Sequence, residues 1–95
     1  MNDSWYRMVV NAATRDKDLA WIDEQSAGYE VEINERPDLA MIAVQGPQAK
    51  EKLQQVLDQQ GAAVIDALNV FVAAEVDDYF IGRTGYTGED GFEII

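Results

Sequence analysis

Three evenly spaced glycines near the C-terminal end of the sequence mark the segment best suited to chemistry. Residues 83–93 read Arg-Thr-Gly-Tyr-Thr-Gly-Glu-Asp-Gly-Phe-Glu. Glycine lets the backbone approach a flat ring closely, and a carboxylate such as Glu93 accepts two parallel hydrogen bonds from an amino-pyrimidine edge. Tyr86 adds an aromatic face or a hydroxyl group. The segment therefore indicates a site for such a ring, although a glycine-rich hairpin with Glu93 in solvent remains the alternative.

The rest of the composition excludes several other kinds of chemistry. The glycine segment lacks the Gly-Lys-Ser/Thr ending of a P-loop and the spacing of a dinucleotide fingerprint. The 95 residues include no cysteine and no histidine, so we expect no disulfide, thiol nucleophile, histidine triad or common zinc site. Glu30, Glu32 and Glu35 are predicted to form a solvated strand face and not a cation site. We therefore expect no metal.

Charge and hydropathy also limit the partners and the location. A net charge of −11 repels phosphate backbones, so we expect no nucleic-acid partner. The longest apolar run, around residues 39–44, is far shorter than the roughly 20 residues of a membrane-spanning helix. A secretory signal has a basic region followed by an apolar stretch, and the first residues show no such pattern. We therefore expect a cytoplasmic protein with no membrane partner.

The glycine segment must be positioned by strands and helices, which hydrophobic periodicity and turn residues predict. One helix is expected between Thr14 and Gly28, and a second between Pro47 and Gly61. Strands are expected at residues 5–10, 29–33, 39–44, 70–76 and 79–83, and another starts after the glycines. The predicted fold class is α+β: a ferredoxin-like β-α-β-β-α-β layout with extra antiparallel strands, truncated at the C-terminus. We expect residues 1–95 to be a single domain, with Trp5, Tyr6 and Trp21 packed in its core.

Three blocks of the sequence resemble one known family. Residues 83–93 look like the signature of the aminomethyltransferase, or T-protein, of the glycine cleavage system. Residues 6–21, Tyr-Arg-Met-Val-Val-Asn-Ala-Ala-Thr-Arg-Asp-Lys-Asp-Leu-Ala-Trp, are similar to a second block of that family. Residues 41–47, Met-Ile-Ala-Val-Gln-Gly-Pro, resemble a third. The blocks follow the family's order and cover almost the whole chain.

The resemblance implies a function and a set of site residues. The family transfers a one-carbon unit from the aminomethyl-lipoyl arm of its partner, the H-protein, to tetrahydrofolate and releases ammonia. Asn11, Tyr86 and Glu93 match family positions that line the folate pocket, and Glu93 would hold the amino-pyrimidine edge of the pterin. Arg83 suits either the carboxylate of a folate tail or a surface ion pair.

The sequence also departs from the family. The key aspartate of the family lies in a Gly-Gly…Asp-Asp segment before the first strand, and no such segment occurs here. We therefore expect a central fragment of the folate-binding region that has no catalytic residue, is inactive alone and self-associates through exposed strand edges. Two alternatives remain: the folate-binding module of a dimethylglycine- or sarcosine-oxidising enzyme, and a non-catalytic interaction domain of the same fold.

Overall fold

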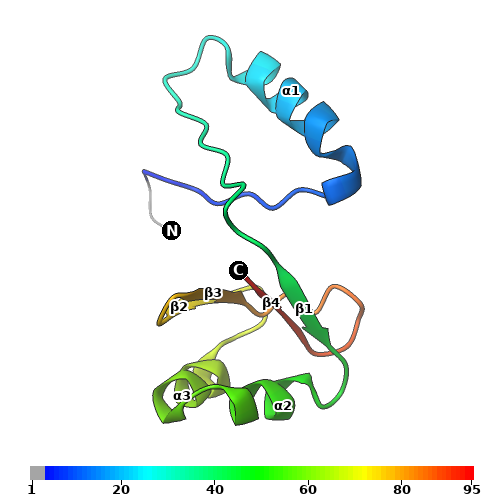
Figure 1. Ribbon diagram of the computed structural model, residues 1–95, viewed down its shortest axis with the longest axis vertical. Coiled ribbons are helices and arrows are strands. Elements are labelled where there is room, and N and C mark those ends of the chain that lie inside the picture. The colour runs from blue at the N-terminus through cyan, green and yellow to red at the C-terminus, as the bar shows by residue number, and fades with distance from the viewer. Residues whose placement is uncertain (1–3) are drawn as a thin grey trace. The chain divides into compact units, whose positions relative to one another are not determined.

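The computed structural model describes residues 4–95, which form two compact units. One unit ends at Glu35 and the other spans Arg36–Ile95. The elements in chain order are η1 (Ala12–Thr14), α1 (Arg15–Ser26), β1 (Ile42–Gln45), α2 (Ala49–Val56), α3 (Gln59–Ala67), β2 (Ala73–Val76), β3 (Tyr79–Gly82) and β4 (Gly91–Ile94) (Figure 1). This combination of helices with an antiparallel sheet confirms the predicted α+β class.

The N-terminal unit is built around α1, which begins and ends close to the predicted positions. Asp16 and Asp18 lie in its first turn, where carboxylates stabilise the positive end of the helix dipole. The Thr14 hydroxyl donates to Asp18 Oδ2 at 2.7 Å and does not cap a backbone N–H group. α1 has 12 residues, and no helix within residues 4–95 is long and apolar enough to cross a membrane.

Two predicted strands are not formed. Residues 5–10 and 29–33 have no regular structure apart from an isolated bridge at Trp5, so the strands that the ferredoxin-like layout required there are missing. The alternating side chains of the second segment are exposed: Tyr29 by 72%, Val31 by 60% and Ile33 by 43%. An alternating pattern says which face a strand would bury, but a strand also needs a hydrogen-bonded neighbour.

The core packing predicted for the N-terminal aromatic residues is also wrong. Trp5 is 40% exposed, Tyr6 80% and Trp21 62%. Aromatic and β-branched residues favour strands because they pack well on a covered sheet. No such sheet forms around residues 5–10, so the side chains stay at the surface.

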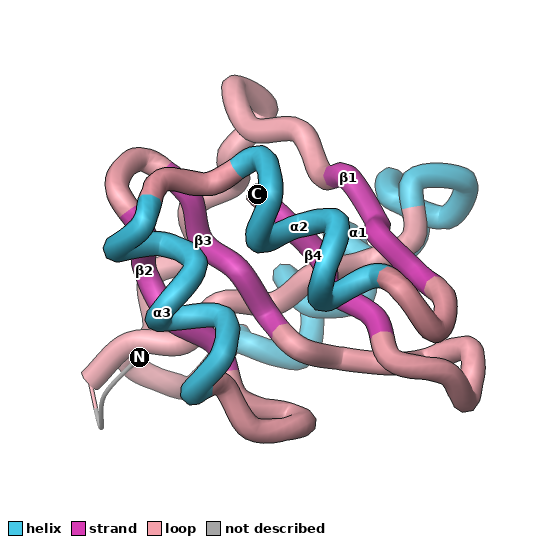
Figure 2. Tube along the Cα trace, turned by 90° about the horizontal axis from the view of Figure 1, so that it is seen from below, coloured by secondary structure: helices cyan, strands magenta, loops and turns pink. Residues whose placement is uncertain are grey.

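The C-terminal unit consists of a four-stranded sheet with helices on one face. The strand order is β1-β4-β3-β2, and every neighbouring pair is antiparallel. Helices α2 and α3 cover one face of this sheet (Figure 2). The core between them consists of Ala49, Leu53, Ile65, Leu68, Val76, Ile81 and Phe92.

The helical part of this unit differs from the prediction of one helix between Pro47 and Gly61. Asp58 divides it, because its side chain accepts a 2.7 Å hydrogen bond from the Gly61 N–H group and so caps the start of α3. Gly61 is buried inside α3 and is not a C-terminal cap. A Cβ atom on Gly61 would lie 3.0 Å from Val76 Cγ1, so the glycine allows α3 to pack tightly against β2.

The remaining predicted strands are present in the structure. β2 and β3 form a hairpin whose turn is Asp77-Asp78, as expected, with Asp77 at φ 52°. β4 begins at Gly91, the last glycine of the segment. The strand predicted for residues 39–44 begins three residues later, at Ile42.

Candidate functional site

Residues 83–90 of the glycine segment form the loop between β3 and β4, and the last three residues of the segment begin β4. Gly85 and Gly88 have φ angles of 53° and 86°, in the region that favours glycine. The Gly85 N–H group donates to the Gly91 carbonyl at 3.1 Å, and the Gly88 N–H group donates to the Gly85 carbonyl at 3.0 Å. A Cβ atom on Gly85 would lie 2.9 Å from the Glu89 carbonyl oxygen. The turn therefore requires glycine at its first position.

Arg83 and Asp90 close the base of this loop. Arg83 Nε and Nη2 donate to the two carboxylate oxygens of Asp90 at 2.9 and 3.0 Å. Arg83 Nη1 donates to the Leu68 carbonyl at 2.7 Å, and the guanidinium carbon lies 5.7 Å from the centroid of the Phe92 ring. Of the two partners expected for Arg83, the ion pair is the one found. The guanidinium is engaged inside the domain.

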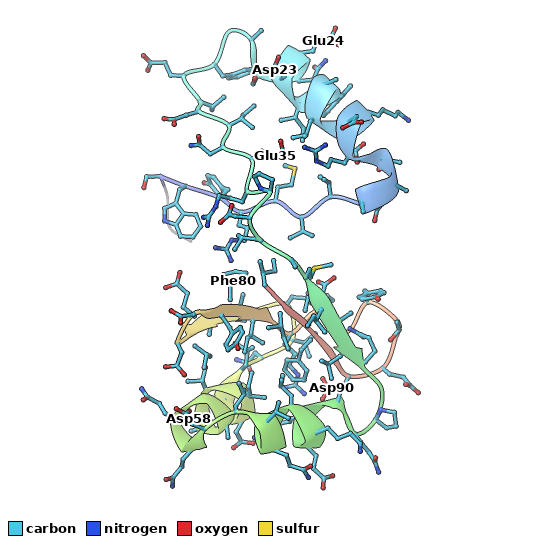
Figure 3. The ribbon with its side chains drawn as sticks, viewed as in Figure 1. Asp23, Glu24, Glu35, Asp58, Phe80 and Asp90 are labelled. Carbon is cyan, nitrogen blue, oxygen red and sulfur yellow. The ribbon has the colours of Figure 1, made fainter. Side chains whose placement is uncertain are left out.

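The ion pair changes the pKa values of both groups. Its hydrogen bonds lower the pKa of the Asp90 carboxyl group from its ordinary value and raise the pKa of Arg83. The Asp90 carbonyl also accepts a 2.9 Å hydrogen bond from the Gly46 N–H group. Asp90, labelled in Figure 3, therefore ties the loop to Arg83 and to the residue that follows β1.

Glu93 lies on the side of the sheet away from α2 and α3. Phe92 is fully buried in the core, and side chains alternate along a strand, so Gly91 and Glu93 face the opposite way. Cross-strand partners share a face, and those of Glu93 are Ala43 on β1 and Gly82 on β3. The half-buried carboxylate is therefore flanked by a methyl group on one side and no side chain on the other.

Gln45 also lies on this side, which we call the Glu93 face and define by Ala43, Gln45, Gly82, Gly91 and Glu93. Gln45 is the cross-strand partner of Gly91. Its side-chain amide occupies the space that a Cβ atom on Gly91 would fill. The Thr87 hydroxyl donates to Gln45 Oε1 at 3.3 Å. Two sequence blocks, residues 41–47 and 83–93, thus meet on one surface.

The three predicted site residues have different settings. Tyr86 is 65% exposed, in the turn of the glycine loop. Glu93 is half-buried on β4 of the same unit. Asn11 belongs to the N-terminal unit, where it is exposed and its carbonyl accepts a 3.2 Å hydrogen bond from the Thr14 N–H group. Tyr86 and Glu93 thus belong to one loop-and-strand segment of the C-terminal unit, whereas Asn11 belongs to the other unit.

Sequence reasoning gave Gln45 no role in the site. The residue was visible within the block at 41–47, but nothing in the sequence says that its side chain lies against Gly91.

Within residues 4–95, no group of three or more acidic side chains gathers in a way that could hold a metal ion.

A comparison with protein families identifies the family of the chain. The family model described as GCVT N-terminal domain matches residues 1–95. The chain belongs to this family. The family predicted from the three sequence blocks is thereby confirmed.

Membership of the GCVT N-terminal domain family adds chemistry to the geometry. The family is folate-binding and of the aminomethyltransferase type. A folate carries a flat pterin ring with an N–H group beside an exocyclic amino group. Such an edge matches the two acceptor oxygens of the Glu93 carboxylate.

Proposed function

We propose that this chain binds tetrahydrofolate for an aminomethyltransferase of the glycine cleavage system. The methylene carbon of the aminomethyl-lipoyl arm would be transferred to tetrahydrofolate, where it would bridge two nitrogen atoms. The amino group of the arm would leave as ammonia, and the arm would be released in its dithiol form. The observation that carries the proposal is Glu93, whose cross-strand neighbours are Ala43 and Gly82. Small neighbours leave room for a flat ring beside the carboxylate.

The chain's own residues would act by orientation. Glu93 would accept hydrogen bonds from the ring N–H and amino groups, and a charged acceptor makes such bonds strong and directional. Tyr86 would lie against the ring or donate its hydroxyl. Holding the folate in one orientation would present its reacting nitrogens to the incoming carbon, which lowers the entropic part of the barrier.

The partner we propose is the lipoylated H-protein, because its arm would deliver the carbon to the bound folate. Analytical ultracentrifugation of the chain with aminomethyl-loaded H-protein checks this step. We expect a complex with the lipoylated form and a weaker one with the form that lacks lipoate. Equal sedimentation of the chain with and without H-protein would contradict this partner.

Folate binding is tested by titrating 5-methyltetrahydrofolate into the chain by calorimetry. Glu93→Gln removes the charge but keeps the shape, and a charged hydrogen bond contributes about 1.5–3 kcal/mol, so we expect the affinity to fall by about tenfold to a hundredfold. Glu75→Gln is the matched control, because Glu75 pairs with Phe80 and so lies on the same sheet face but away from Glu93. Absence of binding by the wild type, or equal affinities of all three proteins, would refute the proposal.

A further inference from the structure

Two buried polar groups near Glu93 have no partner in the fold. Gln45 Nε2 and Thr84 Oγ1 are both shielded from solvent, and neither has a hydrogen-bond partner among the described residues. Native proteins pair nearly all such groups, because a buried donor without an acceptor is destabilising. An unpaired group in a native structure therefore calls for an explanation.

Both groups lie on the side of the sheet that carries Glu93. The Gln45 amide occupies the position of the missing Gly91 side chain, and Gly91 is two residues before Glu93 on the same strand. The Thr84 methyl group lies 3.6 Å from where a Cβ atom on Gly82 would stand. Gly82 is the cross-strand partner of Glu93. The two unpaired groups thus lie on the Glu93 face, one on β1 and the other just after β3.

Of the two polar atoms of the Gln45 side-chain amide, one has a hydrogen-bond partner and the other has none among the described residues. Its Oε1 atom accepts from the Thr87 hydroxyl, which leaves the NH₂ group as the available donor. The last torsion of a glutamine side chain is broad. Turning the amide about this torsion from Gly91 toward a group bound beside Glu93 would exchange the 3.3 Å hydrogen bond with Thr87 for a bond to that group.

We propose that Gln45 and Thr84 are ligand-binding residues that complete the Glu93 site and set its specificity. The Gln45 amide donates to an acceptor that adjoins the two donors held by Glu93, and the Thr84 hydroxyl bonds to the same ring. Donor, donor and acceptor in a row is the edge of a pterin that carries an oxo group. This inference rests on the proposed function, and it adds that the site selects an oxo-pterin over an amino-pterin.

The experiment compares ligands that differ at this position and in the proton on the adjacent ring nitrogen, which the oxo form carries and the amino form lacks. Folic acid has the oxo group, and aminopterin has an amino group in its place. Their affinities, and that of 5-methyltetrahydrofolate, are measured by calorimetry for the wild type, Gln45→Glu, Gln45→Met and Thr84→Val. Gln55→Glu, at an exposed position of α2, controls for added charge. Thermal unfolding by circular dichroism verifies that each variant is folded at the temperature of the titration.

The expected result is a change in specificity and not only in affinity. Gln45→Glu replaces a donor by an acceptor, so 5-methyltetrahydrofolate should bind about tenfold or more weakly, because a buried polar group loses its partner. The affinity ratio of folic acid to aminopterin should move toward aminopterin by a similar factor. Thr84→Val should weaken the binding of both folic acid and aminopterin. Gln55→Glu should change neither the affinities for these two ligands nor the ratio between them.

Two outcomes separate this inference from the proposed function. Loss of binding in Glu93→Gln, with unchanged affinity and ratio in the Gln45 and Thr84 variants, overturns the inference and leaves the proposed function standing. A wild type that binds none of the three ligands overturns both. Equal weakening of folic acid and aminopterin by Gln45→Glu would also overturn the assigned selectivity.

Discussion

The Arg83–Asp90 ion pair is expected to contribute measurably to the stability of this chain, because both of its side chains are largely buried. It cross-links the two ends of the glycine loop and joins them, through Arg83 Nη1, to the Leu68 carbonyl that follows α3. Asp90→Asn keeps the size of the side chain and removes its charge. Arg83 would then keep its charge inside the domain without a countercharge.

The loss of stability expected for Asp90→Asn follows from the burial of the ion pair. The side chains of Arg83 and Asp90 are only 20% and 27% exposed. Exposed pairs contribute about 0–1 kcal/mol, whereas breaking a fully buried pair destabilises by about 3–5 kcal/mol. For this intermediate case we expect a loss of about 2 kcal/mol in the free energy of unfolding at pH 7, which corresponds to a decrease in Tm of about 8–16 °C for a domain of this size.

The same pair should make stability depend on pH. Its hydrogen bonds lower the pKa of Asp90 in the folded state. The stabilisation is therefore complete above the pKa of Asp90 in the unfolded chain, and it is lost as the pH falls through the lower folded-state pKa. Protonated Asp90 closely resembles the asparagine of the variant. The difference in stability between wild type and Asp90→Asn should thus shrink in acid.

Urea unfolding followed by circular dichroism at pH 7 and in acid measures this difference. Asp66→Asn is the control, because Asp66 pairs with Lys50 but is 71% exposed, and we expect almost no change in stability. A loss as large in the control as in Asp90→Asn would refute the argument from burial. A loss in Asp90→Asn that stays constant as the pH falls would refute the argument from charge.

Three further predictions concern backbone strain and packing. Phe71 has φ 64° and is 85% exposed, so Phe71→Gly should stabilise the chain by about 1 kcal/mol and raise its Tm, because the strained conformation suits glycine. Gly85→Ala should destabilise more than Gly88→Ala in urea unfolding, because only the Gly85 position would add a clash, with the Glu89 carbonyl, to the backbone strain. Phe92 is fully buried, so Phe92→Ala should lower the free energy of unfolding by about 3–5 kcal/mol. Tyr79→Ala is the comparison, because Tyr79 is half-exposed on the neighbouring strand, and its free energy of unfolding should fall far less.

Local sequence signals predicted the elements that need only local interactions. The acidic first turn of α1 and the glycines at 85 and 88 act within a few residues, so their effects are visible in the sequence. The division of the predicted second helix by Asp58 was also encoded locally, because aspartate is a strong N-cap. The strands expected at residues 5–10 and 29–33 failed because pairing depends on a distant partner.

The sequence by itself determined the α+β class, the turn at the glycines and the family, since three ordered blocks carry the resemblance. Alternation along β4 also determined that Phe92 and Glu93 face opposite ways. Only the tertiary structure decided which face α2 and α3 would cover, and hence that Phe92 is buried and Glu93 lies away from the helices. It alone placed Gln45 against Gly91, because that contact depends on the register between two strands more than forty residues apart in the chain.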